Sequence, residues 1–222
     1  MSLIFLNDYN KKVKFQKFNK FFAAFVALFP LIGSIMFFNY IDFMAYLGCA
    51  AFVYSPQLIE RFFNIVVLEE LRFLTVFQVM LHAIFGKFFH FYDKFPLYDS
   101  ILHVTGGILL AFLGLSTFYG LEKRFSNYTP RAFKTKVSIA SFNLVNSLGV
   151  IWEIIEFTAD QIFGGTPGYR LAQEGSLFDT MTDLIENNMG ALLAILIFWR
   201  VIELKKEKEL PVDKTMKDLI KI

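Results

Sequence analysis

The sequence predicts an all-α fold, namely a polytopic transmembrane helical bundle of about six spans with both termini in the cytoplasm. Hydrophobic residues make up 55% of the 222 residues and charged residues only 19%, whereas a soluble domain is about 45–50% apolar and about 25% charged. The chain also contains several apolar stretches close to the length of a bilayer span, and its lysines and arginines gather in alternate loops. These observations exclude a disordered chain, a coiled coil and an ordinary soluble domain.

A membrane span needs roughly 17–25 mostly apolar residues. The first and fourth expected spans are free of charge, the second is short, the third contains Lys87, and the fifth and sixth carry acidic residues. The six expected spans are residues 21–41, 43–59, 73–92, 100–121, 137–160 and 179–200.

Basic residues set the expected orientation of these spans, because lysine and arginine concentrate in cytoplasmic loops. They cluster before the first span, between the fourth and fifth spans, and after the sixth span. The expected organisation is a basic cytoplasmic segment at residues 1–20, a transmembrane bundle at residues 21–203 and a basic cytoplasmic tail at residues 204–222. Twenty residues precede the first apolar stretch, which argues against a cleavable signal peptide. We therefore expect a multi-pass protein of a bacterial-type cytoplasmic (inner) membrane.

Other features narrow the functional classes. The single cysteine, Cys49, excludes an intramolecular disulfide and a cysteine-based zinc site. A net charge of +2 gives no reason to expect nucleic-acid binding. The sequence has no glycine-rich phosphate loop and no dinucleotide fingerprint, so we expect no nucleotide or organic cofactor.

Acidic residues lie inside the fifth and sixth expected spans and at the start of the fourth, although an ionisable group costs about 2.5–3.5 kcal/mol at the bilayer centre. Within each span the spacing of three, four or seven residues places them on one helix face. The three faces are Asp99 with His103, then Glu153 with Glu156 and Asp160, and finally Asp179 with Asp183 and Asn187.

The predicted topology places these three faces at the same depth. Asp99 and Asp179 begin their spans at the outer side, and Asp160 ends its span at the outer side. With a rise of about 1.5 Å per residue, Glu153 lies roughly 10 Å deeper than Asp160, and Asn187 roughly 12 Å deeper than Asp179. If the helices pack together, the faces form one pocket open to the extracytoplasmic side.

Six clustered carboxylates cannot all remain ionised without cations. Some are either protonated and hydrogen-bonded, or they bind a divalent metal, for which carboxylates with one imidazole suit Zn²⁺, Mn²⁺, Mg²⁺ or Ca²⁺. The expected metal ligands are Asp99, His103, Glu153, Glu156, Asp160, Asp179 and Asp183. Structural roles remain open for four of the residues: Asp99 and Asp179 can stabilise helix N-termini, His103 can be a structural histidine, and Asn187 can bridge helices.

Three ordered motifs resemble those of the YjdF-like bacterial inner-membrane proteins. They are YDSILHVTGG at residues 98–107, WEIIEF at residues 152–157 and QEGSLFDTMTDLIENNMGA at residues 173–191. Phe157 and Phe178 stand where that family usually has tryptophan. The resemblance covers roughly residues 60–200, and as a family these proteins are functionally uncharacterised.

A more distant resemblance links the chain to VanZ-like proteins. Their pattern of D-x-x-x-H, then E, then R with D-x-x-x-N-x-x-G is matched here by Arg170, Asp183, Asn187 and Gly190. Glu156 replaces the glutamine usual in that pattern. This resemblance implies an envelope role, because VanZ-like proteins are associated with resistance to glycopeptide antibiotics, especially teicoplanin.

The leading hypothesis is a metal-dependent membrane enzyme that acts on a lipid or a lipid-linked envelope substrate from the outer leaflet. Glu156, Asp183 and His103 are the candidate catalytic residues, with a carboxylate as general base toward a metal-bound water. Arg170, Gln173 and Asn187 are candidate substrate-binding residues, since an arginine suits an anionic headgroup. Two alternatives remain: a cation- or proton-coupled transporter, and a non-catalytic subunit that binds a lipid or an envelope partner.

Overall fold

The computed structural model describes residues 9–37, 40–63, 67–125 and 129–207, and within these ranges the regular structure is helical throughout. This confirms the all-α prediction. The chain divides into two compact units at Tyr98 and Asp99. The predicted bundle at residues 21–203 is therefore divided between two units. The predicted basic tail at residues 204–222 lies almost wholly outside the described residues.

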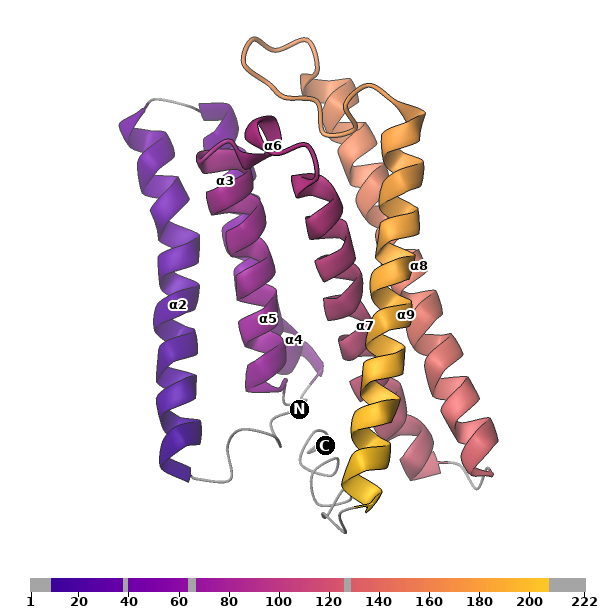
Figure 1. The fold of residues 1–222 in the computed structure, drawn as a ribbon. Coiled ribbons are helices and arrows are strands. Elements are labelled where there is room, and N and C mark those ends of the chain that lie inside the picture. The colour runs from indigo at the N-terminus through magenta and orange to yellow at the C-terminus, as the bar shows by residue number, and fades with distance from the viewer. Residues whose placement is uncertain (1–8, 38–39, 64–66, 126–128, 208–222) are drawn as a thin grey trace. The chain divides into compact units, whose positions relative to one another are not determined.

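The first unit contains helices α2 (Tyr9–Met36), α3 (Tyr40–Val53), α4 (Ser55–Phe63) and α5 (Glu69–Val79). Helix α5 continues into the π-helix η1 (Met80–Phe88), and the short helix α6 (Phe91–Lys94) follows. The core of this unit is apolar and includes Val26, Tyr46, Val53, Val76 and Ala83. Helix α3 turns back alongside α2, as Figure 1 shows.

Among the described residues, five helical stretches are long and apolar enough to cross a membrane: Lys14–Met36, Glu69–Phe88, Tyr98–Glu122, Pro130–Phe163 and Leu177–Glu203. The expected second span, residues 43–59, differs from the others. It is divided at Tyr54 into the 14-residue helix α3 and the amphipathic helix α4. Proline disfavours helical geometry in the residue before it and lacks an N–H donor, so Pro56 explains a break near this position. At about 21 Å, α3 is shorter than a bilayer core of about 30 Å.

The second unit contains three long helices, α7 (Tyr98–Phe125), α8 (Pro130–Phe163) and α9 (Leu177–Glu207). Consecutive helices run in opposite directions (Figure 1). Thr129 caps α8 by accepting a hydrogen bond from the main-chain nitrogen of Ala132, and Pro130 occupies the first turn, where its missing N–H costs nothing. Small residues fill the core between the helices, namely Ala111, Val145, Ala191 and Ala194.

Helix α8 has an apolar outer face and an inner face of mostly small residues that ends at a buried acid. Its buried residues recur every four positions and end at the acid: Val137, Ser141, Val145, Gly149 and Glu153. Its exposed residues near the same end are large and apolar, as at Ile151, Ile154, Ile155 and Phe157. This distribution is the one expected of a helix that faces lipid with one side and a protein interior with the other.

A groove of about 390 Å³ lies at the opposite end of α8 and α9. There the indole nitrogen of Trp199 donates to Ser138 Oγ at 2.8 Å, and Lys134 Nζ pairs with Glu203 Oε1 at 3.1 Å. Lys134 precedes Glu153 by nineteen residues of continuous helix, or about 28 Å along α8. The groove is therefore separate from the acidic residues.

Candidate metal centre

The acidic residues of α7, α8 and α9 converge at one end of the second unit. Asp99 and His103 lie in the first turns of α7, Glu153 and Glu156 in the last turns of α8, and Asp183 in the second turn of α9. Antiparallel neighbours place the start of one helix beside the end of the next, so residues far apart in sequence meet here.

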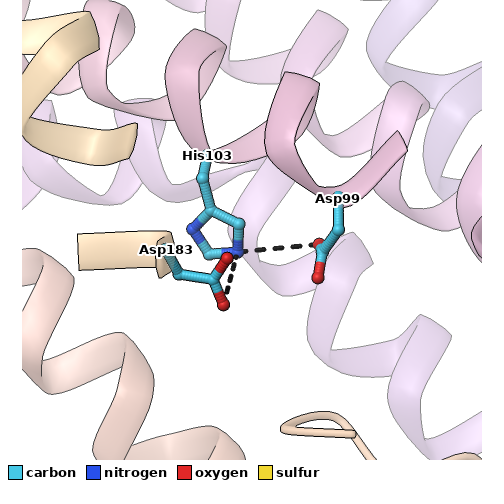
Figure 2. Close-up of side chains that lie close together, drawn as sticks. All are labelled: Asp99, His103 and Asp183. Atoms are coloured by element: carbon cyan, nitrogen blue, oxygen red, sulfur yellow. Dashed lines mark ion pairs between the residues drawn. The ribbon is translucent and has the colours of Figure 1, made fainter. Parts of the chain in front are cut away.

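His103 lies between two carboxylates, as Figure 2 shows. Its Nε2 atom is 3.6 Å from Asp99 Oδ1, one turn earlier on the same helix, and 3.5 Å from Asp183 Oδ2 on α9. His103 is 8% exposed and Asp183 is 3% exposed. One oxygen or nitrogen atom from each of the three residues lies within 4.8 Å of the others. Two atoms that each lie about 2.0–2.6 Å from one ion are separated by at most about twice that distance. The three residues therefore fit a single metal.

The other imidazole nitrogen of His103 faces α9. Asn187 Nδ2 lies 3.3 Å from His103 Nδ1, and Asn187 is buried one turn after Asp183. A metal on Nε2 requires the proton on Nδ1, so the Asn187 amide would then turn its oxygen toward Nδ1 to accept that proton and fix the tautomer. The structure thus places the predicted substrate-binding residue Asn187 behind His103.

A second group of possible ligands consists of Glu153, Glu156 and Asp183, with one oxygen from each within 4.8 Å of the others. Glu153 is 5% exposed, and neither of its carboxylate oxygens has a hydrogen-bond partner among the described residues. The side chains of Gln173 and Thr180 lie near this carboxylate, and Gln173 Nε2 donates a hydrogen bond to Thr180 Oγ1 at 2.8 Å. Asp183 belongs to both groups.

Glycines bring α7 and α9 into close contact beside this cluster. A Cβ atom added at Gly107 would overlap the main-chain oxygen of Asn187, and one added at Gly190 would overlap the main-chain oxygen of Val104. Residues without side chains allow two membrane helices to approach closely. The approach places His103, one turn before Gly107, against Asp183 and Asn187.

Asp160 is not part of either group. Its carboxylate accepts hydrogen bonds from Tyr169 Oη at 3.0 Å, from the main-chain nitrogen of Ala172 at 2.7 Å and from that of Gln173 at 2.9 Å. Asp160 therefore holds the loop at residues 164–176 against the end of α8. Burial and the hydrogen bond to Asp160 raise the pKa of Tyr169 to about 12.

The remaining predicted residues lie at the edge of the cluster. Asp179 is in the first turn of α9, where an acid is favoured by the helix dipole, and it is absent from both groups of possible ligands. Arg170 is half-exposed in the loop and pairs with Glu174 at 2.6 Å. Gln173, besides its contact with Thr180, lies 3.5 Å from the main-chain oxygen of Glu153.

Thr180 and the structural role of Asp160 were not predicted from the sequence. No sequence pattern marks Thr180 as a site residue, because its spacing from the acidic residues of the same helix matches no ligand or capping motif. Asp160 did give one: an acid that ends a helix just before the glycine-rich segment at residues 164–168 commonly accepts hydrogen bonds from the main chain of the following loop.

Long apolar helices with outward hydrophobic residues and an inward acidic cluster define a multi-pass helical membrane protein. The chain belongs to the family described as "Predicted membrane protein (DUF2238)", whose model matches residues 42–203. Membership is in keeping with the expected resemblance to YjdF-like proteins, while the resemblance to VanZ-like proteins stays a prediction.

A protein of Thermotoga maritima, described as uncharacterized, is 29% identical to this chain over 192 residues. The aligned region covers 85% of this chain and 92% of that protein. No solved structure matches the chain.

Proposed function

We propose that this membrane protein binds a divalent metal in the cluster of Asp99, His103, Glu153, Glu156 and Asp183, and hydrolyses a lipid or lipid-linked envelope substrate there. The observation that carries the proposal is Glu153, which is 5% exposed and has no hydrogen-bond partner for either carboxylate oxygen among the described residues. Two further groups of the cluster, His103 and Asp183, are also buried.

The energetic argument rests on the cost of burial. An unpartnered polar group buried in protein costs about 1–3 kcal/mol, and an unpaired charge costs more. Protonation would remove the charge of Glu153 and let it donate one hydrogen bond to a neighbouring carboxylate of Glu156 or Asp183, while other oxygens of the cluster stay unpartnered among the described residues. A divalent cation offsets the charge of several carboxylates at once and occupies their free oxygens, which is why buried acids commonly bind metals.

In the proposed reaction, a divalent ion held by these residues would lower the pKa of a bound water and so supply the nucleophile. The water oxygen forms a bond to the carbonyl carbon or phosphorus of the substrate, and the bond to the alcohol oxygen breaks. The carboxylate oxygen of Glu156 that does not hold the ion would accept a proton from the water, and the leaving alcohol oxygen would receive a proton in turn, while His103 and Asp183 would hold the metal.

The loop at residues 164–176 supplies the proposed binding determinants for the headgroup. Arg170 and Gln173 lie in this loop, and Gln173 contacts both the main chain of Glu153 and the side chain of Thr180. An anionic headgroup would compete with Glu174 for the guanidinium of Arg170, with which Glu174 now pairs. We propose a bacterial cytoplasmic membrane as the location of the protein, and the distribution of lysine and arginine supports an orientation with this loop on the outer side.

The test uses the detergent-purified protein reconstituted into vesicles of phosphatidylglycerol and phosphatidylethanolamine, with an isoprenyl diphosphate lipid added. Products are followed by mass spectrometry with Zn²⁺, Mn²⁺, Mg²⁺ or Ca²⁺ supplied. We expect product with at least one metal, and none after chelation or in Asp183→Asn. Glu203→Gln, which removes an exposed carboxylate at the other end of the unit, serves as the matched control and keeps parental turnover.

Equal turnover in the chelated protein, in Asp183→Asn and in the parent would overturn the enzyme assignment. Metal binding without turnover on any of these lipids would favour the non-catalytic lipid-binding alternative. The transporter alternative has less support, because two of the polar residues deeper along α8, Ser138 and Ser141, bond to main-chain oxygens of their own helix. Cation flux in proteoliposomes that Asp183→Asn abolishes would favour it instead.

A further inference from the structure

Asp183 occupies a special position in the cluster, because its carboxylate belongs to both groups of possible ligands. It lies on α9 between His103 of α7, 3.5 Å away, and the two glutamates of α8. A carboxylate has two oxygens and about four lone-pair directions, so it can bind two ions at once.

The two groups offer different ligand chemistry. Asp99, His103 and Asp183 provide one imidazole and two carboxylates, a set that suits Zn²⁺ or Mn²⁺. Glu153, Glu156 and Asp183 provide oxygen alone, which suits Mg²⁺, Ca²⁺ or Mn²⁺. Mn²⁺ fits both sets.

The charge of the cluster also exceeds what one divalent ion balances. Its five residues include four carboxylates, namely Asp99, Glu153, Glu156 and Asp183. If all four are ionised, one divalent ion leaves a net charge of about −2 and two ions leave none. The buried and unpartnered carboxylate of Glu153 belongs to the all-oxygen group, so an ion held only by Asp99, His103 and Asp183 would leave it without a partner.

We propose that the cluster is a dinuclear metal centre in which Asp183 bridges two divalent ions, one held by Asp99 and His103 and the other by Glu153 and Glu156. This inference rests on the proposed function, because it specifies how many ions the same site binds. In dinuclear sites the ions lie about 3.5–4 Å apart and stabilise both the attacking and the leaving oxygen of a displacement. Such a centre favours a phosphoester as the substrate over a carboxylic ester.

The test measures Mn²⁺ in the full-length protein, stripped of metal in detergent and reloaded with Mn²⁺ alone. Elemental analysis gives the equivalents bound per chain, and electron paramagnetic resonance reports whether bound ions are magnetically coupled. We expect about two equivalents per chain and a coupled spectrum, since a bridging carboxylate holds the ions close together.

Variants separate the two positions. In Glu153→Gln we expect about one equivalent and the spectrum of isolated Mn²⁺, because only the ion at His103 remains bound. Asp183→Asn removes the bridge and loses the coupling together with most of the bound metal. Glu203→Gln keeps both ions, and monodisperse elution of each variant shows that it is folded. Since Glu153→Gln removes only one side of the centre, it keeps the test informative if Asp183→Asn does not fold.

The failures of the two proposals are distinguishable. One equivalent without coupling in the parent would overturn the dinuclear centre and leave the proposed metal-dependent function standing. If the parent binds no Mn²⁺, and separate reloading with Zn²⁺, Mg²⁺ or Ca²⁺ also gives no bound ion, both the dinuclear centre and the metal-dependent function would be overturned. Two equivalents that Glu153→Gln and Asp183→Asn both retain would place the ions elsewhere and would also overturn the inference.

Discussion

Gly107 of α7 lies directly against the main-chain oxygen of Asn187 in α9, so that an added Cβ atom would overlap it. Gly190 makes the reciprocal approach to the main-chain oxygen of Val104. These two contacts set the distance between the helix that carries His103 and the helix that carries Asp183. The separation of possible metal ligands therefore depends on the absence of two side chains.

The first prediction concerns Gly107→Ala. The added methyl group forces the two helices apart, and overpacking of this kind costs about 1–3 kcal/mol of folding free energy. We expect a lower thermal unfolding midpoint in detergent and weaker metal binding. The matched control is Gly165→Ala, because nothing lies within 4 Å of a Cβ atom at Gly165. Parental stability and metal content in Gly107→Ala would contradict the role assigned to this contact.

The second prediction concerns Glu153→Gln, whose effect on stability should change sign with metal. Without metal, the substitution removes a buried carboxylate that has no hydrogen-bond partner, so the variant should be as stable as the parent or more stable. With metal, the parent gains binding free energy that the variant lacks in part, so the variant should be the less stable protein. The thermal unfolding midpoints of both proteins, each measured with chelator and with Mn²⁺, give the four stabilities to be compared. Destabilisation by the same amount in both conditions would argue that Glu153 has a purely structural role.

The third prediction concerns Asn187→Leu, which keeps the size of the side chain and removes its contact with His103 Nδ1. Loss of a polar partner behind a metal-binding histidine typically lowers metal affinity about 10–100-fold. We expect weaker binding of Zn²⁺, measured by competition with a chromophoric chelator. Asn146→Leu is the control, since Asn146 bonds to the main chain of its own helix at Phe142. Unchanged affinity in Asn187→Leu would separate Asn187 from the metal centre.

The fourth prediction concerns Tyr169 and the loop that it joins to Asp160. The pKa of Tyr169 is about 12 in the folded protein and about 10 for an ordinary tyrosine. Between these values the folded state holds a proton that the unfolded state has lost, so this contribution to stability is complete below pH 10 and is lost as the pH rises through about 12. The difference in tyrosinate absorbance between the parent and Tyr169→Phe isolates this titration.

Asp160→Asn provides the companion measurement for the loop. It weakens the acceptor of three hydrogen bonds from Tyr169, Ala172 and Gln173, so Tyr169 should titrate closer to its ordinary pKa and limited proteolysis should cut the loop faster. Metal content should stay at the parental value, because Asp160 is outside both groups of ligands. Loss of metal in this variant would mean that Asp160 acts at the centre after all.

Much of the helical architecture could be predicted from the sequence. The stretches at residues 100–121, 137–160 and 179–200 correspond to α7, α8 and α9, because long apolar segments can satisfy their main-chain polar groups only as helices within a bilayer. The stretch at residues 43–59 was predicted less well. Hydropathy is averaged over a window of residues, so the apolar composition of this stretch gave no sign of the helix interruption at Tyr54. That interruption depends on the local main-chain geometry imposed near Pro56.

The sequence by itself determined that this is a helical membrane protein and that the acids of each span share one helix face, because span length and helical periodicity follow from local composition. It did not determine which acids meet. Seven residues were expected to share a metal site, and the tertiary structure brings five of them into two groups joined at Asp183, while Asp160 bonds to the loop and Asp179 lies apart. Those outcomes depend on how each helix is rotated about its axis and on how closely α7 approaches α9. Both are set by contacts such as that of Gly107 with Asn187, which arise only when the helices pack.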